Sequence, residues 1–175
     1  APPTVTLARW RQARRADVRA DAPLHVVYTG RLEERKGLFV LLDAWPAIKS
    51  DTPDARLTIA GKGELETAIR NRIAAAGLQD VTMVPSPDDA AAPPLVASAD
   101  VFVAPALGGE SFGLVLIEAM AAGVIPVAAN NAGYASVMTG AGADLLFTAG
   151  DAATLAQKVT DLARDPAKRQ QMRDW

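Results

Sequence analysis

The sequence has no cysteine, and this absence removes several kinds of site at once. Disulfide bonds, thiolate nucleophiles and cysteine-ligated metals all require the cysteine sulfur. The single histidine, His25, excludes a metal centre built from several imidazoles. The sequence also lacks an Asp-x-Asp pattern, so we do not expect a metal held in that way. We therefore expect a protein that works without a metal or another cofactor.

Charge and hydrophobicity exclude further classes of protein. The formal net charge is −2, so no overall positive field would attract a nucleic acid, and we expect no nucleic-acid partner. No apolar run approaches the roughly 20 residues that a membrane-spanning helix needs, and we find no secretory signal pattern. We therefore expect a cytoplasmic protein. Aromatic residues make up only 5% of a chain rich in alanine, valine and glycine, which favours a layered α/β fold.

Segments typical of strands and of helices alternate along most of the chain. Short apolar runs predict six strands, at 25–30, 56–60, 81–84, 101–104, 124–129 and 145–147. The segments between and after them predict helices at 37–49, 64–76, 91–98, 112–122, 152–164 and 166–174. This alternation indicates a Rossmann-like α/β fold, an open parallel sheet of about six strands with helices on both faces. In the common order 3-2-1-4-5-6, the first and fourth strands would be neighbours.

Residues 1–23 precede this pattern, and we expect them to form a basic helical lead-in or interdomain linker to a domain that comprises residues 24–175. The lead-in is predicted to be helical over 5–19. Five arginines lie in it, namely Arg9, Arg11, Arg14, Arg15 and Arg19. The helix could dock on a membrane surface or on a partner, or it could be a solvated linker helix. We favour the solvated linker.

The stretch 105–123 carries most of the functional signal. A buried strand ends at Pro105, a glycine-containing loop follows, and Ser111 is the expected N-cap of an apolar helix that should be deeply packed. The free amides at the start of this helix would form an anion site. They belong to Ser111, Phe112, Gly113 and Leu114. Glu110 precedes this site, and Glu118, the only ionisable residue of the helix, is costly to bury without hydrogen bonds. The stretch predicts a pocket for a ligand with phosphate and hydroxyl groups.

Other polar residues follow the carboxyl ends of further predicted strands, where open α/β sheets bind ligands. Arg31 and Lys36 follow the first strand and could hold a diphosphate, although a solvated turn of mixed charge is the alternative. Gly61 and Gly63 follow the second strand. The pair Asp88-Asp89 follows the third strand, and it would either contact the ligand or cap the next helix.

Together these motifs resemble the C-terminal, donor-binding domain of a family-4 glycosyltransferase of the GT-B type. The resemblance covers about residues 24–175, and its most specific mark is the Glu-x7-Glu pair, here Glu110 and Glu118. The other matching motifs are Gly30-Arg31, Lys36-Gly37, Gly61-x-Gly63, Glu110-Ser-Phe-Gly113 and Glu118-Ala-Met-Ala. The run 104–123 looks most like that of actinobacterial phosphatidylinositol mannosyltransferases, which use GDP-mannose.

The resemblance implies a retaining, metal-independent hexosyltransferase whose donor is a nucleotide-diphosphate sugar. It assigns catalytic roles to Arg31 and Lys36 at the donor diphosphate and to Glu110 at the sugar hydroxyls. Glu118 would accept hydrogen bonds from the ribose hydroxyls. The other substrate-binding residues that it implies are Gly61, Gly63, Asp89, Ser111, Phe112, Gly113 and Leu114.

The chain departs from the family at a few positions. Ala92 stands where the mannosyltransferases have a lysine that helps to bind guanine. The sequence therefore does not decide between a GDP-linked and a UDP-linked donor. Gly133-Tyr134 and Ser136 stand where many relatives have a Gly-Gly pair and a glutamate. The segment 84–87 contains two prolines where relatives usually have a glycine.

The resemblance also implies a partner, the N-terminal domain of the same enzyme, which would bind the acceptor. Any contact with the membrane would come through that domain, and the longer enzyme would work at the inner face of the plasma membrane. We expect this chain alone to be inactive. Two alternatives remain: a nucleotide-sugar-binding module without turnover, and an NAD-type dinucleotide-binding domain. The second would lack its glycine fingerprint after the first strand.

Overall fold

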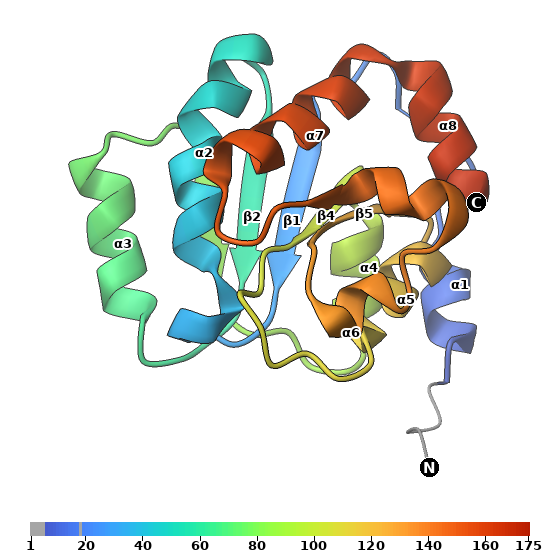
Figure 1. The fold of residues 1–175 in the computed structure, drawn as a ribbon, viewed down its shortest axis with the longest axis horizontal. Helices are drawn as coiled ribbons and strands as arrows, with labels where there is room; N and C mark the ends of the chain where they lie inside the picture. The colour runs from blue at the N-terminus through green and yellow to red at the C-terminus, as the bar shows by residue number, and fades with distance from the viewer. Residues whose placement is uncertain (1–5, 18) are drawn as a thin grey trace.

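The computed structural model describes residues 6–17 and 19–175 of the chain. Six strands form one sheet of order β3-β2-β1-β4-β5-β6, and each pair of neighbours is parallel (Figure 1). The strands are β1 His25–Thr29, β2 Arg56–Ala60, β3 Val81–Val84, β4 Val101–Ala104, β5 Ile125–Ala129 and β6 Leu146–Phe147. The predicted fold class is confirmed, and the strand order is the common one considered in the sequence analysis.

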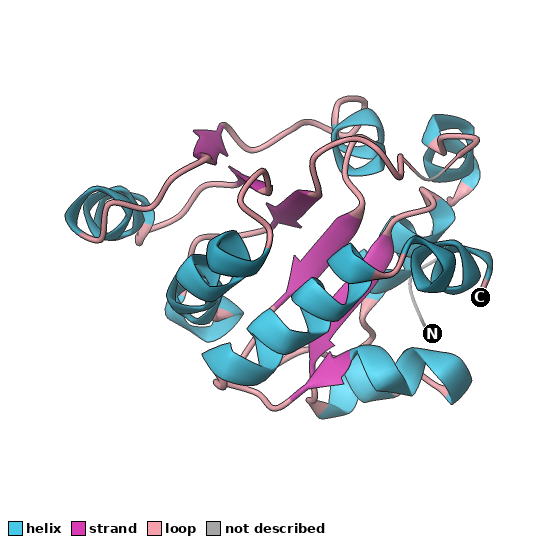
Figure 2. Cartoon of the chain, turned by 90° about the horizontal axis from the view of Figure 1, so that it is seen from above, coloured by secondary structure: helices cyan, strands magenta, loops and turns pink. Residues whose placement is uncertain are grey.

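Helices cover both faces of the sheet (Figure 2). They are α1 Ala8–Ala13, α2 Leu38–Asp51, α3 Glu66–Ala75, α4 Ala92–Ala97, α5 Leu114–Ala121, α6 Ala132–Ala135, α7 Ala152–Arg164 and α8 Pro166–Asp174. One set consists of α2 with α3 and α7, and the other of α4 with α5 and α1. Within the described residues, no helix has both the length and the apolar character needed to cross a membrane.

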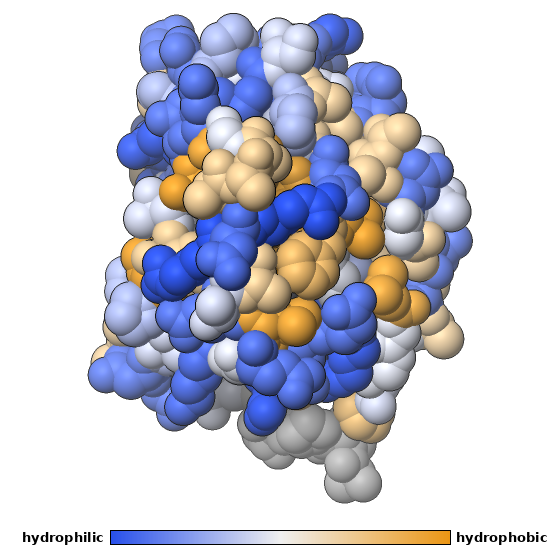
Figure 3. Space-filling model, turned by 90° about the vertical axis from the view of Figure 1, so that its left-hand side faces the viewer, coloured by the Kyte–Doolittle hydropathy of each residue, from blue (hydrophilic) through white to orange (hydrophobic). Residues whose placement is uncertain are grey.

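The central strands are apolar along their whole length because side chains on both faces are covered by helices. Every residue of β4 and β5 is buried. The edge strand β3 is only partly covered. On the α3 side of the molecule, hydrophilic side chains lie around and between patches of apolar surface (Figure 3). The core is therefore centred on β1, β4 and β5, and the loops after β1 and β4 begin at its most buried strands.

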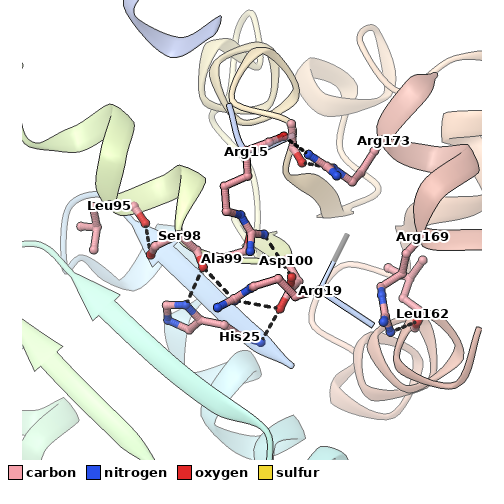
Figure 4. Close-up of polar contacts among 11 residues, drawn as sticks. Arg15, Arg19, His25, Leu95, Ser98, Ala99, Asp100, Leu162, Arg169 and Arg173 are labelled. Atoms are coloured by element: carbon pink, nitrogen blue, oxygen red, sulfur yellow. Dashed lines mark hydrogen bonds and ion pairs between the residues drawn. The ribbon is translucent and has the colours of Figure 1, made fainter. Parts of the chain in front are cut away.

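The lead-in differs from the solvated helix that we favoured. Its helix, α1, is shorter than predicted, and the predicted part at Val5 and Val18 lies outside the described residues. Trp10 is buried in the core, and α1 packs against α4 and α5. Beyond α1, Arg15 and Arg19 both bond to the buried carboxylate of Asp100 (Figure 4). Burial of an indole and pairing of two arginines hold this segment on the domain.

The central helix also differs from its prediction. It begins at Leu114, and its N-cap is Gly113 in the left-handed conformation, with φ of 58°. Ser111 therefore does not cap it, because the chain turns into the helix two residues later. Only Leu116 and Ala119 are fully buried within α5 and its other residues are partly buried, so the helix is packed less deeply than predicted. The four-residue α6 was not predicted, because it is too short to show a helical period.

Candidate functional site

Two loops that are far apart in the sequence meet at the carboxyl edge of the sheet. They follow β1 and β4, which are paired neighbours. Gly37 lies at the contact with φ of 69°, and a Cβ atom there would be 2.0 Å from the carbonyl oxygen of Pro105. The amide of Leu107 donates a 2.8 Å hydrogen bond to the carbonyl oxygen of Arg35. The absence of a side chain at residue 37 thus lets the two loops lock together.

This contact brings two of the predicted catalytic residues together. Lys36 Nζ lies 2.5 Å from Glu110 Oε1, and the two side chains are only 17% and 14% exposed. Arg35 Nη1 donates to the same carboxylate oxygen over 3.3 Å. Arg35 was not among the predicted site residues. Its place one residue before Lys36 and beside the loop contact is the signal that could have identified it.

Arg31, the third predicted catalytic residue, does not join this cluster. Its Nε lies 2.6 Å from Glu33 Oε1, and its side chain is 74% exposed. The mixed-charge alternative thus describes the contacts that Arg31 makes here. Its predicted contact with a diphosphate stays a prediction, and it requires the guanidinium to leave Glu33.

Two buried tyrosines border the cluster, and the sequence analysis did not assign them to it. Tyr28 and Tyr134 line a small cavity of about 40 Å³ together with Lys36 and Val115. Burial raises the pKa of both phenols, and the charge of Glu110 raises the pKa of each further. Both hydroxyls are therefore neutral donors. Tyr28 donates to the carbonyl oxygen of Arg31 over 2.6 Å, which fixes the loop after β1.

The start of α5 faces solvent at this edge. Ser111 and Phe112 lie in the loop before the helix, and the Phe112 side chain is left 54% exposed. The first helical bonds are donated by Leu116 and Ile117 to the carbonyl oxygen of Gly113. The amides of Leu114 and of the residue after it therefore have no partner within the helix, as is usual at a helix N-terminus. The amides that could bind an anion therefore begin about two residues later than predicted, and anion binding there stays a prediction.

Gly61 and Gly63, predicted to contact substrate, have a packing role in this structure. A Cβ atom on Gly61 would lie 2.0 Å from the carbonyl oxygen of Gly30, and one on Gly63 would lie 2.5 Å from that of Leu32. The amide of Leu32 in turn donates to the carbonyl oxygen of Lys62 over 2.9 Å. These glycines let the loop after β2 pack directly on the loop after β1, and a contact with substrate stays a prediction.

A second group of charged residues lies on the flank formed by α1, α4 and α5. Asp88 Oδ1 accepts hydrogen bonds from the amides of Ala90 and Ala91, so Asp88 caps the turn before α4. Asp89 is 97% exposed, and its Oδ2 lies 3.9 Å from Nη1 of Arg9. Glu118 is half-buried, and this burial raises its pKa; the charge of Asp89 raises the pKa further, whereas that of Arg9 lowers it.

His25 lies outside both groups. It is the first residue of β1, at the amino edge of a parallel sheet, whereas the predicted site follows the carboxyl ends of the strands. Within the described ranges 6–17 and 19–175, no three histidine, aspartate or glutamate side chains form a group that could hold a metal ion. The chemistry that the cluster offers is therefore that of fixed cations, a carboxylate and helix amides.

Comparison with known proteins identifies the family of the chain. The family model of glycosyl transferases group 1 matches residues 11–174. A phosphatidyl-myo-inositol mannosyltransferase of Mycobacterium leprae is 40% identical over 147 residues, which cover 83% of this chain and 38% of that protein. The chain thus spans about two fifths of the length of this relative.

Solved structures show the same fold. The C-terminal domain of a glycosyl transferase group 1 family protein (LpcC) from Francisella tularensis matches with a TM-score of 0.76 and 18% identity, over 98% of this chain and 89% of that one. Anabaena Alr3699/HepE in complex with UDP matches with a TM-score of 0.76 and 23% identity, over 97% of this chain and 46% of that one. With the family match over residues 11–174, the chain belongs to the group 1 glycosyltransferases.

Proposed function

We propose that this chain binds the nucleotide diphosphate of a donor sugar at the carboxyl edge of the sheet, as the donor half of a retaining glycosyltransferase. The observation that carries the proposal is the ion pair between Lys36 and Glu110 beside the start of α5, in a chain of this family. A largely buried cation, a carboxylate and free helix amides suit a ligand that has both phosphate and hydroxyl groups.

The proposed catalysis is mainly electrostatic stabilisation of the leaving group. When the bond to the sugar breaks, negative charge grows on the departing diphosphate. Lys36, Arg35 and the start of α5 would stabilise this charge, and Arg31 would add a cation by leaving Glu33. Glu110 would accept hydrogen bonds from the sugar hydroxyls. Since several cations converge on this place, we propose that the transfer needs no metal ion.

For the donor we propose GDP-mannose. The support is the similarity to a phosphatidyl-myo-inositol mannosyltransferase, whereas the more distant HepE structure contains UDP. Both nucleotides share a ribose diol, which Glu118 would bind by accepting from both hydroxyls. A charge-assisted arrangement of this kind contributes about 1.5–3 kcal/mol.

Calorimetric titration tests this proposal. We expect GDP and GDP-mannose to bind the purified chain, and Glu118→Gln to weaken binding about tenfold or more while the fold stays intact. Asp174→Asn is the control, because it makes the same change from carboxylate to amide at an exposed position of α8, where Asp174 pairs with Arg14. NADH should not bind, in contrast to a dinucleotide-binding domain. Failure of every nucleotide diphosphate to bind would overturn the proposal.

We further propose that this chain binds a donor without transferring the sugar. The cavity beside Lys36 measures about 40 Å³, which is too small to enclose a sugar, so the donor would lie on an open surface. The N-terminal domain of a longer enzyme would enclose the donor from the other side and would contain the acceptor-binding site. Incubation with GDP-mannose and phosphatidylinositol should release no mannolipid. Robust mannolipid formation would contradict the two-domain arrangement.

A further inference from the structure

The short helix α6 lies beside the loop that follows β4, at the carboxyl edge of the sheet (Figure 1). This loop covers residues 106–113, carries Glu110 and ends at the start of α5. It contains glycine at positions 108, 109 and 113. A loop so rich in glycine has many accessible backbone conformations. Contacts with neighbouring elements must therefore fix the place of Glu110.

Asn131 makes the first of these contacts, at the beginning of the loop. Its Nδ2 donates a 3.2 Å hydrogen bond to the carbonyl oxygen of Ala106. Its Oδ1 accepts a 3.0 Å hydrogen bond from the amide of Tyr134, which caps α6. One side chain thus links the N-terminus of α6 to the loop that carries Glu110.

The backbone of Gly133 lies directly against Glu110. A Cβ atom at residue 133 would be 1.9 Å from the carbonyl oxygen of Glu110 and 3.0 Å from its Cβ atom. Gly133 is buried and has no positive φ, so the close approach alone requires glycine here. At the end of the loop, a Cβ atom on Gly113 would be 3.0 Å from Val137 and 3.5 Å from the ring of Tyr134. The segment around α6 therefore supports both ends of the loop and Glu110 between them.

We propose that Asn131 and Gly133 are positioning residues of the donor site, which hold the Glu110 carboxylate where it can accept hydrogen bonds from the sugar hydroxyls of a nucleotide-diphosphate sugar. The inference rests on the proposed function, because it requires Glu110 to contact the sugar. Neither residue contacts the donor; both act through the backbone of the loop. Hydrogen bonds weaken steeply with distance and angle, so a displacement of Glu110 by about 1 Å would remove most of its contribution.

Amide hydrogen exchange tests the support of the loop without a ligand. Asn131→Ser keeps an oxygen that can cap α6, but its shorter side chain cannot also donate to Ala106. We expect the amides of residues 106–113 to exchange about three- to tenfold faster in this variant, and those of α6 to keep their rates. Asn130→Ser makes the same change at the exposed neighbouring residue and should exchange as the wild type does. Unchanged exchange of the loop in Asn131→Ser would overturn the inference, whatever the chain binds.

Calorimetric titration with GDP and GDP-mannose tests the consequence for the site. In Asn131→Ser, the extra affinity of GDP-mannose over GDP should fall about three- to tenfold, whereas GDP itself should bind within about twofold of the wild type. A merely structural role would weaken both ligands equally, and that result would overturn the inference. Gly133→Ala should act in the same direction as Asn131→Ser. Gly108→Ala adds the same methyl group within the loop, where it meets nothing within 4 Å, and should match the wild type.

A double variant shows whether Asn131 acts through Glu110. In a Glu110→Gln background, Asn131→Ser should reduce the extra affinity for GDP-mannose no further, because the carboxylate that it positions is gone. An equal loss in both backgrounds would overturn the inference. If the wild type binds neither ligand, the proposed function fails and the inference fails with it. If Glu110→Gln reduces the extra affinity and Asn131→Ser does not, the inference alone fails.

Discussion

Lys36 Nζ and Glu110 Oε1 lie 2.5 Å apart although 74 positions separate the two residues in the sequence. The parallel pairing of β1 with β4 and the contact of Gly37 with Pro105 produce this approach. The two opposite charges compensate each other. A donor diphosphate would therefore compete with Glu110 for Lys36. Because of this competition, substitution of Glu110 should change the affinity for the diphosphate and the affinity for the sugar in opposite directions.

We predict that Glu110→Gln strengthens GDP binding about two- to fivefold, because Lys36 and Arg35 lose the carboxylate that they now contact. The same variant should lose most of the extra affinity that GDP-mannose has over GDP, since the amide is a weaker acceptor for sugar hydroxyls. Calorimetric titration with both ligands measures the two effects. A loss of GDP affinity of about tenfold would contradict the prediction, because it would place Glu110 on the nucleotide itself.

Gly37→Ala should destabilise the fold by about 2–4 kcal/mol, because a left-handed residue gains a Cβ atom and this atom meets the carbonyl oxygen of Pro105. Gly77→Ala provides the matched control. Gly77 is also left-handed, with φ of 60°, but it faces open space, so about 1 kcal/mol is expected there. Urea unfolding measures both. Equal losses would show that the approach of the two loops tolerates a methyl group.

The sequence was sufficient to predict the fold class and the approach of Lys36 and Glu110 at the carboxyl edge of the sheet. Buried parallel strands are nearly continuous apolar runs, and a glycine or proline marks where several of them end. The start of α5 was predicted too early because Ser111 is a good capping residue type, whereas the left-handed Gly113 sets the actual start. The capping preferences of single residues do not show which glycine adopts the left-handed conformation at the start of the helix.

Contacts between distant segments were the least predictable part of the site. The tertiary fold brings Arg35, Tyr134 and Arg9 to their contacts. None of these residues lies in a sequence motif from which its contact could be predicted. Arg31 shows the reverse case. Its motif predicted a ligand contact, and in the structure a neighbouring glutamate neutralises it. Competition among nearby charges is decided by side-chain geometry, which the sequence does not specify.

His25 should make the fold less stable as the pH falls. Its Nδ1 donates to the carbonyl oxygen of Ser98, and its Nε2 accepts from the hydroxyl of Thr58 (Figure 4 shows the first contact). Burial lowers the pKa of His25, so the unfolded chain binds the proton first. The stabilising contribution is present above about pH 6.5 and is lost as the pH falls through the folded-state pKa.

Urea unfolding at about pH 7 and about pH 5.5 measures this effect. His25→Gln is the comparison, and its free energy of unfolding should fall less over the same interval. The difference between the two proteins is the informative quantity, because the raised pKa of Glu118 acts in the opposite direction in both. Identical slopes in the two proteins would contradict a buried, neutral imidazole.

The last prediction concerns the base of the donor. Guanine presents the N1–H and N2–H₂ donors on one edge, and a carboxylate can accept from both, whereas uracil offers a single N–H there. Asp89 is exposed beside Arg9 in the turn before α4, so its carboxylate is accessible to a base.

We expect GDP to bind about tenfold more tightly than UDP, and Asp89→Asn to narrow this gap in affinity. Ala92→Lys should widen the gap, because the resemblance to the mannosyltransferases implies a lysine at this place that helps to bind guanine. Asp174→Asn, an exposed change on α8, is the control. Equal affinities for GDP and UDP, or a preference for UDP, would show that Ala92 marks a change of donor base.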